Sequence, residues 1–150
     1  MAEEYARASE ARYQSALEDF PAYLRGVLDG ARGLDLSPGR VPYTTFWLTL
    51  GRRLVGRSSI RHHLTPDLAD EGGHIGYDIR PSERQKGYGK LILRLTLAEA
   101  RKLGLNRALL TCDADNVASA KVIEANGGRF QGHGVSKKSG KLISRFWIEL

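Results

Sequence analysis

Hydrophobic and polar residues recur with two different periods along this chain, and the change of period marks where helices give way to strands. The N-terminal segment is rich in Ala, Glu, Arg and Leu, which predicts a helix over Ala2–Asp19. Pro21 breaks or restarts this helix, and the helical pattern continues over Ala22–Ala31. Two prolines and two glycines then predict a loop over Gly33–Pro42.

Strand patterns follow this loop. Thr44–Leu50 is aromatic and β-branched, and together with Leu54–Ile60 across a glycine turn it predicts an antiparallel hairpin. A polar loop over His62–Gly73 separates this hairpin from a third strand, Gly73–Arg80, in which apolar and polar residues alternate. The alternation predicts a strand with one face in the core.

A long helix is predicted over Lys90–Leu103, after the turn Gly87–Gly89. Leu91, Leu95 and Ala98 are expected to form its apolar face. The helix would connect two strands that lie in the same sheet.

The C-terminal part predicts a buried strand, a helix capped by Asp115 or Asn116, and two final strands, over Arg107–Thr111, 116–125, Arg129–His133 and Leu142–Leu150. The order of elements is therefore α, α, β, β, β, α, β, α, β, β. This order predicts an α/β (α+β) fold with a mixed central sheet, antiparallel at both ends, and a βαβ crossover in the middle.

Length and composition place these elements in one domain, residues 1–150. The single cysteine, Cys112, is expected to be a small buried side chain, and no disulfide can form within the chain. No apolar run is long enough to span a bilayer, and the N-terminus lacks the apolar stretch of a signal peptide. We therefore expect a cytoplasmic protein with no membrane partner.

The formal net charge is +6, and the basic residues are spread along the whole chain. Aromatic residues do not interleave with them as a stacking platform for bases would require. A solvated basic surface is therefore expected, with no nucleic-acid partner.

The turn from Arg84 to Gly89 has the composition of an anion-binding site. Two glycines spaced by one residue leave backbone N–H groups accessible, and the helix that follows directs its positive end to the same place. Arg84 and Lys86 are expected to add mobile positive charge, which makes a site suited to a pyrophosphate. The alternative is a glycine turn that only starts a helix.

The same segment, R-Q-K-G-Y-G, resembles the R/Q-x-x-G-x-G/A signature of the GNAT acetyltransferase superfamily. The resemblance continues in G-G-H-I-G-Y-D-I-R-P-S-E-R-Q-K-G-Y-G, in L-T-C-D-A-D-N-V-A-S-A-K-V-I-E-A-N-G-G and in the late R-F-W-I, and it covers at least Val41–Leu150. These segments look like one bacterial branch usually called predicted acetyltransferases. The resemblance implies the GNAT fold and acetyl-CoA as co-substrate. No metal is expected, because nothing near His62 and His63 completes a metal site.

The resemblance also implies positions for the co-substrate. The pyrophosphate would be held by backbone amides of Gln85, Lys86, Gly87, Tyr88, Gly89 and Lys90. The pantetheine arm would lie between the strand that ends at Ile79–Arg80 and the strand Ala108–Thr111. Asn116 and Ser119 match positions beside the pantetheine in the superfamily, although a helix cap and a surface hydroxyl are equally consistent with the sequence.

One position departs from the superfamily pattern. Many members have a tyrosine seven residues after that asparagine, which protonates the leaving thiolate; here the position is Ile123. Either another phenol supplies the proton, or water does, or the thiolate leaves unaided.

A general base is needed because an alkyl ammonium, with a pKa near 10, must lose a proton before it attacks a thioester. His74 is the first candidate, since its strand carries the base in several superfamily members and its ordinary pKa of about 6.5 suits the task. Glu71 is the second, acting through a water. A strand histidine that only pairs with its neighbours is the alternative for His74.

The acceptor is expected to be an amine of a small molecule or peptide, bound near the N-terminal helices and the first hairpin. Asp67, Asp70 and Glu71 would attract a cationic acceptor or form an exposed acidic loop. The sequence thus predicts an acetyl-CoA-dependent N-acetyltransferase, monomeric or homodimeric. The alternative is a non-catalytic acyl-CoA-binding or partner-binding module on the same fold.

Overall fold

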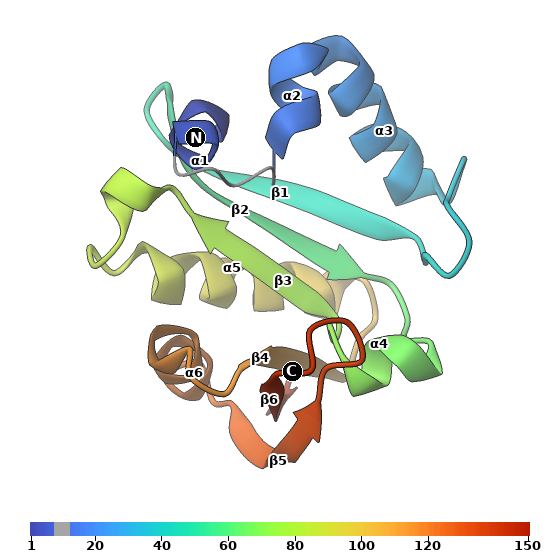
Figure 1. Cartoon of the computed structure of the whole chain (residues 1–150), viewed down its shortest axis with the longest axis vertical. Coiled ribbons are helices and arrows are strands. Elements are labelled where there is room, and N and C mark those ends of the chain that lie inside the picture. The colour runs from blue at the N-terminus through green and yellow to red at the C-terminus, as the bar shows by residue number, and fades with distance from the viewer. Residues whose placement is uncertain (8–12) are drawn as a thin grey trace.

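In the computed structural model, which describes residues 1–7 and 13–150, the strands form two three-stranded antiparallel sheets (Figure 1). The first sheet has the order β1-β2-β3, formed by Tyr43–Leu50, Arg53–Arg61 and Ile75–Ile79. The second has the order β4-β6-β5, formed by Arg107–Asp113, Leu142–Glu149 and Arg129–Val135. The predicted mixed α/β class, antiparallel at both ends with a helix crossing over in the middle, is confirmed.

Three helices precede the first strand: α1 (Ala2–Arg7), α2 (Gln14–Glu18) and α3 (Phe20–Arg32). Only the two ends of the predicted helix Ala2–Asp19 are described, because residues 8–12 lie outside the described residues. Pro21 restarts the helix rather than merely ending one. It occupies the first turn of α3, where no N–H is needed, and the Asp19 carboxylate accepts a hydrogen bond from the Ala22 N–H at 2.9 Å.

The crossover helix α5 (Tyr88–Lys102) packs on β2 and β3 and carries much of the core. The predicted apolar face is wrong: Leu95 is 48% exposed. The buried side chains are instead Ile92, Leu93, Thr96, Leu97 and Ala100. The surface offered by the sheet selects which stripe of the helix is covered, and an apolar residue outside that stripe stays in water. Leu93, Leu97 and Ala100 join residues of both sheets in one cluster.

Two short helices complete the fold. The loop predicted over His62–Gly73 contains α4 (Pro66–Asp70), which begins where the Thr65 hydroxyl accepts a hydrogen bond from the Leu68 N–H. The Thr-Pro pair at its start was the available signal. The predicted helix after β4 is α6 (Val117–Glu124). Among the helices that the structure describes, none is long and apolar enough to cross a membrane.

The two sheets are joined by hydrogen bonds around His74, which contacts β4. The His74 N–H donates to the Leu109 carbonyl at 2.7 Å, and the Leu109 N–H donates to His74 Nδ1 at 3.0 Å. Within the described part of the chain, no backbone hydrogen bond joins β3 itself to β4. The central sheet is therefore split beyond His74, and the edge of β3 that faces β4 has no strand partner.

Candidate functional site

The turn before α5 leaves a run of backbone N–H groups unpaired. Gln85 and Gly87 have φ of 61° and 84°, and the first hydrogen bond of the helix runs from the Leu91 N–H to the Gly87 carbonyl. Among residues 1–7 and 13–150, no acceptor is found for the N–H groups from Gln85 to Lys90. Unpaired N–H groups at the positive end of a helix form a site for an anion such as a phosphate.

Other protein groups hold the two basic side chains of this turn. Arg84 donates to the Ile79 carbonyl and to the Tyr5 hydroxyl, at 3.3 Å each. Lys86 donates to the Ser82 carbonyl at 2.9 Å and to the Glu83 carboxylate at 3.1 Å. Both cations, which the sequence analysis expects to be mobile, thus contact neighbouring groups in this structure.

Glu83, which the sequence did not single out, anchors the turn. Its side chain is only 4% exposed and forms ion pairs with Lys86 and with Arg53 of β2, the latter at 3.3 Å. A buried carboxylate with two cationic partners fixes the loop onto the sheet. The turn thus presents its amides from a stable position.

Tyr77 of β3 contacts Ser119 of α6 beside the split between β3 and β4. A hydrogen bond of 3.0 Å joins the Tyr77 hydroxyl to Ser119 Oγ, and burial raises the pKa of Tyr77 to about 12. Asn116 caps α6, since its Oδ1 accepts from the Ser119 N–H at 3.0 Å. In the alternation of the predicted strand Gly73–Arg80, Tyr77 counts as an apolar position, and this pattern gives no sign of a role for its hydroxyl.

Ile123 and Cys112 belong to the core beside this split. Ile123 is completely buried, and its hydrocarbon side chain has no proton to donate. Burial raises the pKa of the Cys112 thiol, as expected for a small core side chain.

His74 is 7% exposed, and its ring lies 6.0 Å from the ring of Trp147. Burial, followed by the nearby charges of Arg107 and Arg61, lowers the pKa of His74. A neutral ring that accepts at Nδ1 carries its proton on Nε2, so its one lone pair is already used by the Leu109 N–H. This geometry favours the structural alternative for His74 over a general base.

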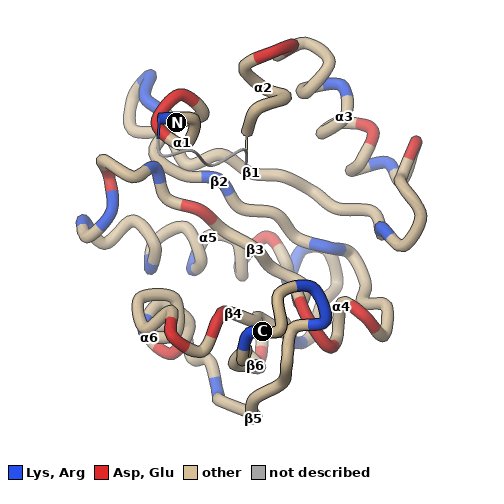
Figure 2. Tube along the Cα trace, viewed as in Figure 1, with Lys and Arg blue, Asp and Glu red and all other residues tan. Residues whose placement is uncertain are grey.

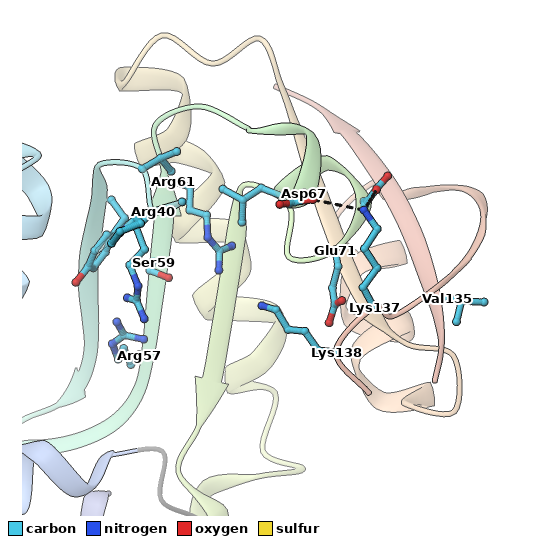
Figure 3. A pocket seen from close by; sticks show the side chains of 15 residues that line it. Arg40, Arg57, Ser59, Arg61, Asp67, Glu71, Val135, Lys137 and Lys138 are labelled. Carbon is cyan, nitrogen blue, oxygen red and sulfur yellow. Dashed lines mark hydrogen bonds and ion pairs between the residues drawn. The ribbon is translucent and has the colours of Figure 1, made fainter. Parts of the chain in front are cut away.

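Glu71 lies at the same junction but faces a cavity. The neighbouring Gly72 N–H donates to Thr111 Oγ1 of β4 at 3.0 Å, which holds this segment beside the split. Ser136 Oγ lies 3.0 and 2.9 Å from the two carboxylate oxygens of Glu71. The cavity has a volume of about 610 Å³ and lies between β2, α4 and the loops that precede β1 and β6 (Figure 3).

The predicted site residues thus fall into two groups. Those expected to hold the co-substrate lie around the turn before α5 and the free edge of β3, whereas Asp67, Asp70 and Glu71, expected to meet the acceptor, line the cavity. A family model described as an acetyltransferase (GNAT) domain matches residues 4–129. The chain belongs to the GNAT acetyltransferase family.

Solved structures of GNAT proteins have the same fold. RimJ of Mycobacterium smegmatis, in complex with CoA-disulfide, superposes with a TM-score of 0.67 at 21% identity, covering 87% of this chain and 60% of that one. For yncA of Salmonella typhimurium, a putative acetyltransferase solved with its cofactor acetyl-CoA, the TM-score is 0.60 at 17% identity, and the match covers 72% of this chain and 65% of that one. For spermidine N-acetyltransferase SpeG of Vibrio cholerae, the TM-score is 0.59 at 17% identity, and the match covers 71% of this chain and 65% of that one.

This chain therefore spans less than two thirds of the length of those three proteins. None of the curated proteins searched matches the sequence significantly.

Proposed function

We propose that the protein transfers the acetyl group of acetyl-CoA to an amine of a small molecule or peptide. The observation that carries the proposal is the run of unpaired N–H groups from Gln85 to Lys90 beside the free edge of β3. The first feature suits a pyrophosphate, and the second suits an extended amide-containing arm such as pantetheine. Amines are an apt acceptor class, since SpeG acts on spermidine as its name states.

Acetyl-CoA would supply a thioester carbonyl at the junction of β3 and β4. The amine nitrogen would form a bond to that carbonyl carbon while the carbon–sulfur bond breaks, and Glu71 would take the proton released by the amine. We propose Glu71 as the base because its carboxylate faces the cavity and its protein partner there is the neutral Ser136 hydroxyl. His74, the first choice from the sequence, is proposed instead to position β3 against β4.

Tyr77 is proposed to stabilise the leaving sulfur. Ile123 cannot donate a proton, and Tyr77 places a phenol across the split near Cys112 and Ser119. A phenol with a pKa of about 12 stays protonated at neutral pH, so it would act as a hydrogen-bond donor rather than release its proton to bulk water. Asn116 and Ser119 would hold α6 and this phenol in place.

The release of free thiol from acetyl-CoA in the presence of a panel of amines tests the proposed function. We expect thiol release that depends on the amine and forms an acetylated product that mass spectrometry detects. Binding of acetyl-CoA without turnover of any amine would instead support the second candidate, an acyl-CoA-binding module. The absence of a tyrosine at position 123 favours that candidate. The single cysteine is consistent with the cytoplasmic location that we propose.

The role of the turn can be separated from its backbone strain, because α5 has equivalent glycines at both ends. Gly87 and Gly104 share a φ of 84°, and a Cβ on either would meet no atom within 4 Å. We expect Gly87→Ala and Gly104→Ala to lower the free energy of unfolding by the same amount, about 1–2 kcal/mol. Only Gly87→Ala should weaken acetyl-CoA binding in calorimetry, by about tenfold or more, because it shifts the amides that face the phosphate. Equal affinity in the two variants would argue against the site.

A further inference from the structure

The cavity beside Glu71 has walls of opposite charge. Its acidic residues are Asp67, Asp70 and Glu71, which lie on or next to α4. Figure 2 shows acidic positions at α4 near the basic loop between β5 and β6. Its basic side chains come from three separate segments and are Arg40, Arg57, Arg61, Lys137 and Lys138. Which of these charges are already paired decides what the cavity attracts.

Two of the three carboxylates are paired with cations. Lys137 Nζ lies 3.4 Å from Asp67 and 3.0 Å from Asp70, and Arg145 approaches Asp70 at 3.7 Å. These contacts raise the pKa of Lys137, the hydrogen bond to Asp70 most of all. Glu71, hydrogen-bonded to the neutral Ser136 hydroxyl, has no cationic partner within the described part of the chain. One carboxylate therefore remains to attract an ammonium group.

The opposite wall holds arginines that have no carboxylate partner among the residues that the structure describes. Arg61 donates to the Gly72 and Gly73 carbonyls at 3.0 and 2.8 Å, and burial and then the charges of Arg40 and Arg57 lower its pKa. Repulsion between neighbouring guanidinium groups is what a bound anion would relieve.

Arg57 has a buried N–H donor that makes no hydrogen bond within the described part of the chain. Its Nη2 donates to Thr45 Oγ1 at 3.2 Å, and its guanidinium lies 6.0 Å from the ring centre of Tyr13. Its Nε is buried, with no hydrogen-bond partner among the residues that the structure describes. Asp78, opposite Arg57 in the register of β2 and β3, accepts instead from the Tyr13 hydroxyl at 2.8 Å. A buried guanidinium N–H without an acceptor is costly, and a ligand oxygen would remove that cost.

Arg40 and Lys138 complete what we call the cation cluster, formed by Arg40, Arg57 and Lys138. Neither Arg40 nor Lys138 has a side-chain hydrogen bond or ion pair among residues 1–7 and 13–150. Lys138 extends from the opposite side of the cavity toward the arginines (Figure 3). Arg40 and Arg57 also border a second cavity of about 680 Å³ next to α3, so a longer ligand has room beyond them.

We propose that the acceptor is an amine that also carries an anionic group, a carboxylate or a phosphate, bound by the cation cluster while its amine faces Glu71. This assignment rests on the proposed acetyl transfer. The cavity volume suits a small molecule, and the two charges of such a ligand match the two walls. Bidentate pairing of a guanidinium with carboxylate or phosphate oxygens would orient the ligand.

Matched pairs of amines test this proposal. We expect one of two results. Either 4-aminobutyrate is acetylated with a kcat/KM at least about tenfold above that of butylamine, or O-phosphoethanolamine is acetylated with a kcat/KM at least about tenfold above that of ethanolamine. The first pair reports a carboxylate ligand and the second a phosphate ligand. Spermidine, a polycation, should be a poorer acceptor than the preferred anionic amine. Amines without an anionic group, or spermidine, used as well as both anionic amines would overturn the assignment and leave acetyl transfer standing.

Variants identify the group responsible. Arg40 is exposed, so Arg40→Gln should fold normally and raise the KM for the preferred anionic amine by about tenfold or more. The KM for butylamine and for acetyl-CoA should not change, and Arg52→Gln, an exposed arginine that does not line the cavity, is the control.

If no amine is turned over, calorimetry with 4-aminobutyrate and O-phosphoethanolamine in the presence of CoA still decides the matter. Binding that Arg40→Gln weakens would support the anion site without catalysis, and binding of neither compound would overturn it.

Discussion

Glu71→Gln is expected to lower kcat by roughly 10² to 10⁴ while acetyl-CoA affinity stays unchanged. The amide cannot take the proton from the attacking amine, yet it keeps an oxygen to accept from Ser136 Oγ, so the local structure should be preserved. Stopped assays of amine acetylation give kcat, and calorimetry gives acetyl-CoA affinity. A kcat within about threefold of the parent would exclude Glu71 as the base.

His74→Asn is the matched control for this prediction. Asparagine Oδ1 can replace His74 Nδ1 as acceptor for the Leu109 N–H, so the junction of β3 and β4 should survive while the imidazole is lost. We expect near-parental kcat from His74→Asn. A loss as large as that of Glu71→Gln, together with loss of a rising limb below pH about 6.5, would restore His74 as the base.

Gly73→Ala is expected to lower the free energy of unfolding by roughly 2–5 kcal/mol. Gly73 has a φ of 62°, and a Cβ there would collide with the backbone carbonyl of Leu109, which cannot move aside without breaking β4. The same carbonyl accepts the His74 N–H, so the hydrogen bonds that join His74 to β4 would be pushed apart. Urea denaturation followed by circular dichroism measures the change.

Gly76→Ala, three residues further on, separates this collision from a general cost of filling a glycine. Gly76 has no positive φ, and its nearest neighbour to an added Cβ is Ser59 Oγ at an ordinary 3.8 Å. We expect Gly76→Ala to change stability by less than about 1 kcal/mol. Similar losses in both variants would show that the close approach at Leu109 is not what makes Gly73 necessary.

Local patterns in the sequence were sufficient to predict most elements of this fold and the family. The period of the apolar residues and the capping residues predicted β1, β2, β3, β4 and α6, because each of these elements depends on neighbours within a few residues. The same is true of the turn before α5, since Gly87 at a positive φ and a helix start are both local properties. Asn116 also acts as the helix cap that its residue type permits.

The tertiary structure alone decided which groups of that sequence meet. Leu95 and Leu97 are alike by type, but only Leu97 faces the sheet, so composition could not tell which is buried. The contact of His74 with Leu109 joins segments 35 residues apart, and it favours a structural role for His74 over that of a base. The cation cluster likewise combines the loop before β1, β2 and the loop after β5. Such contacts depend on how far apart the strands lie and which way each side chain points, and neither quantity is encoded in the spacing of residues along the chain.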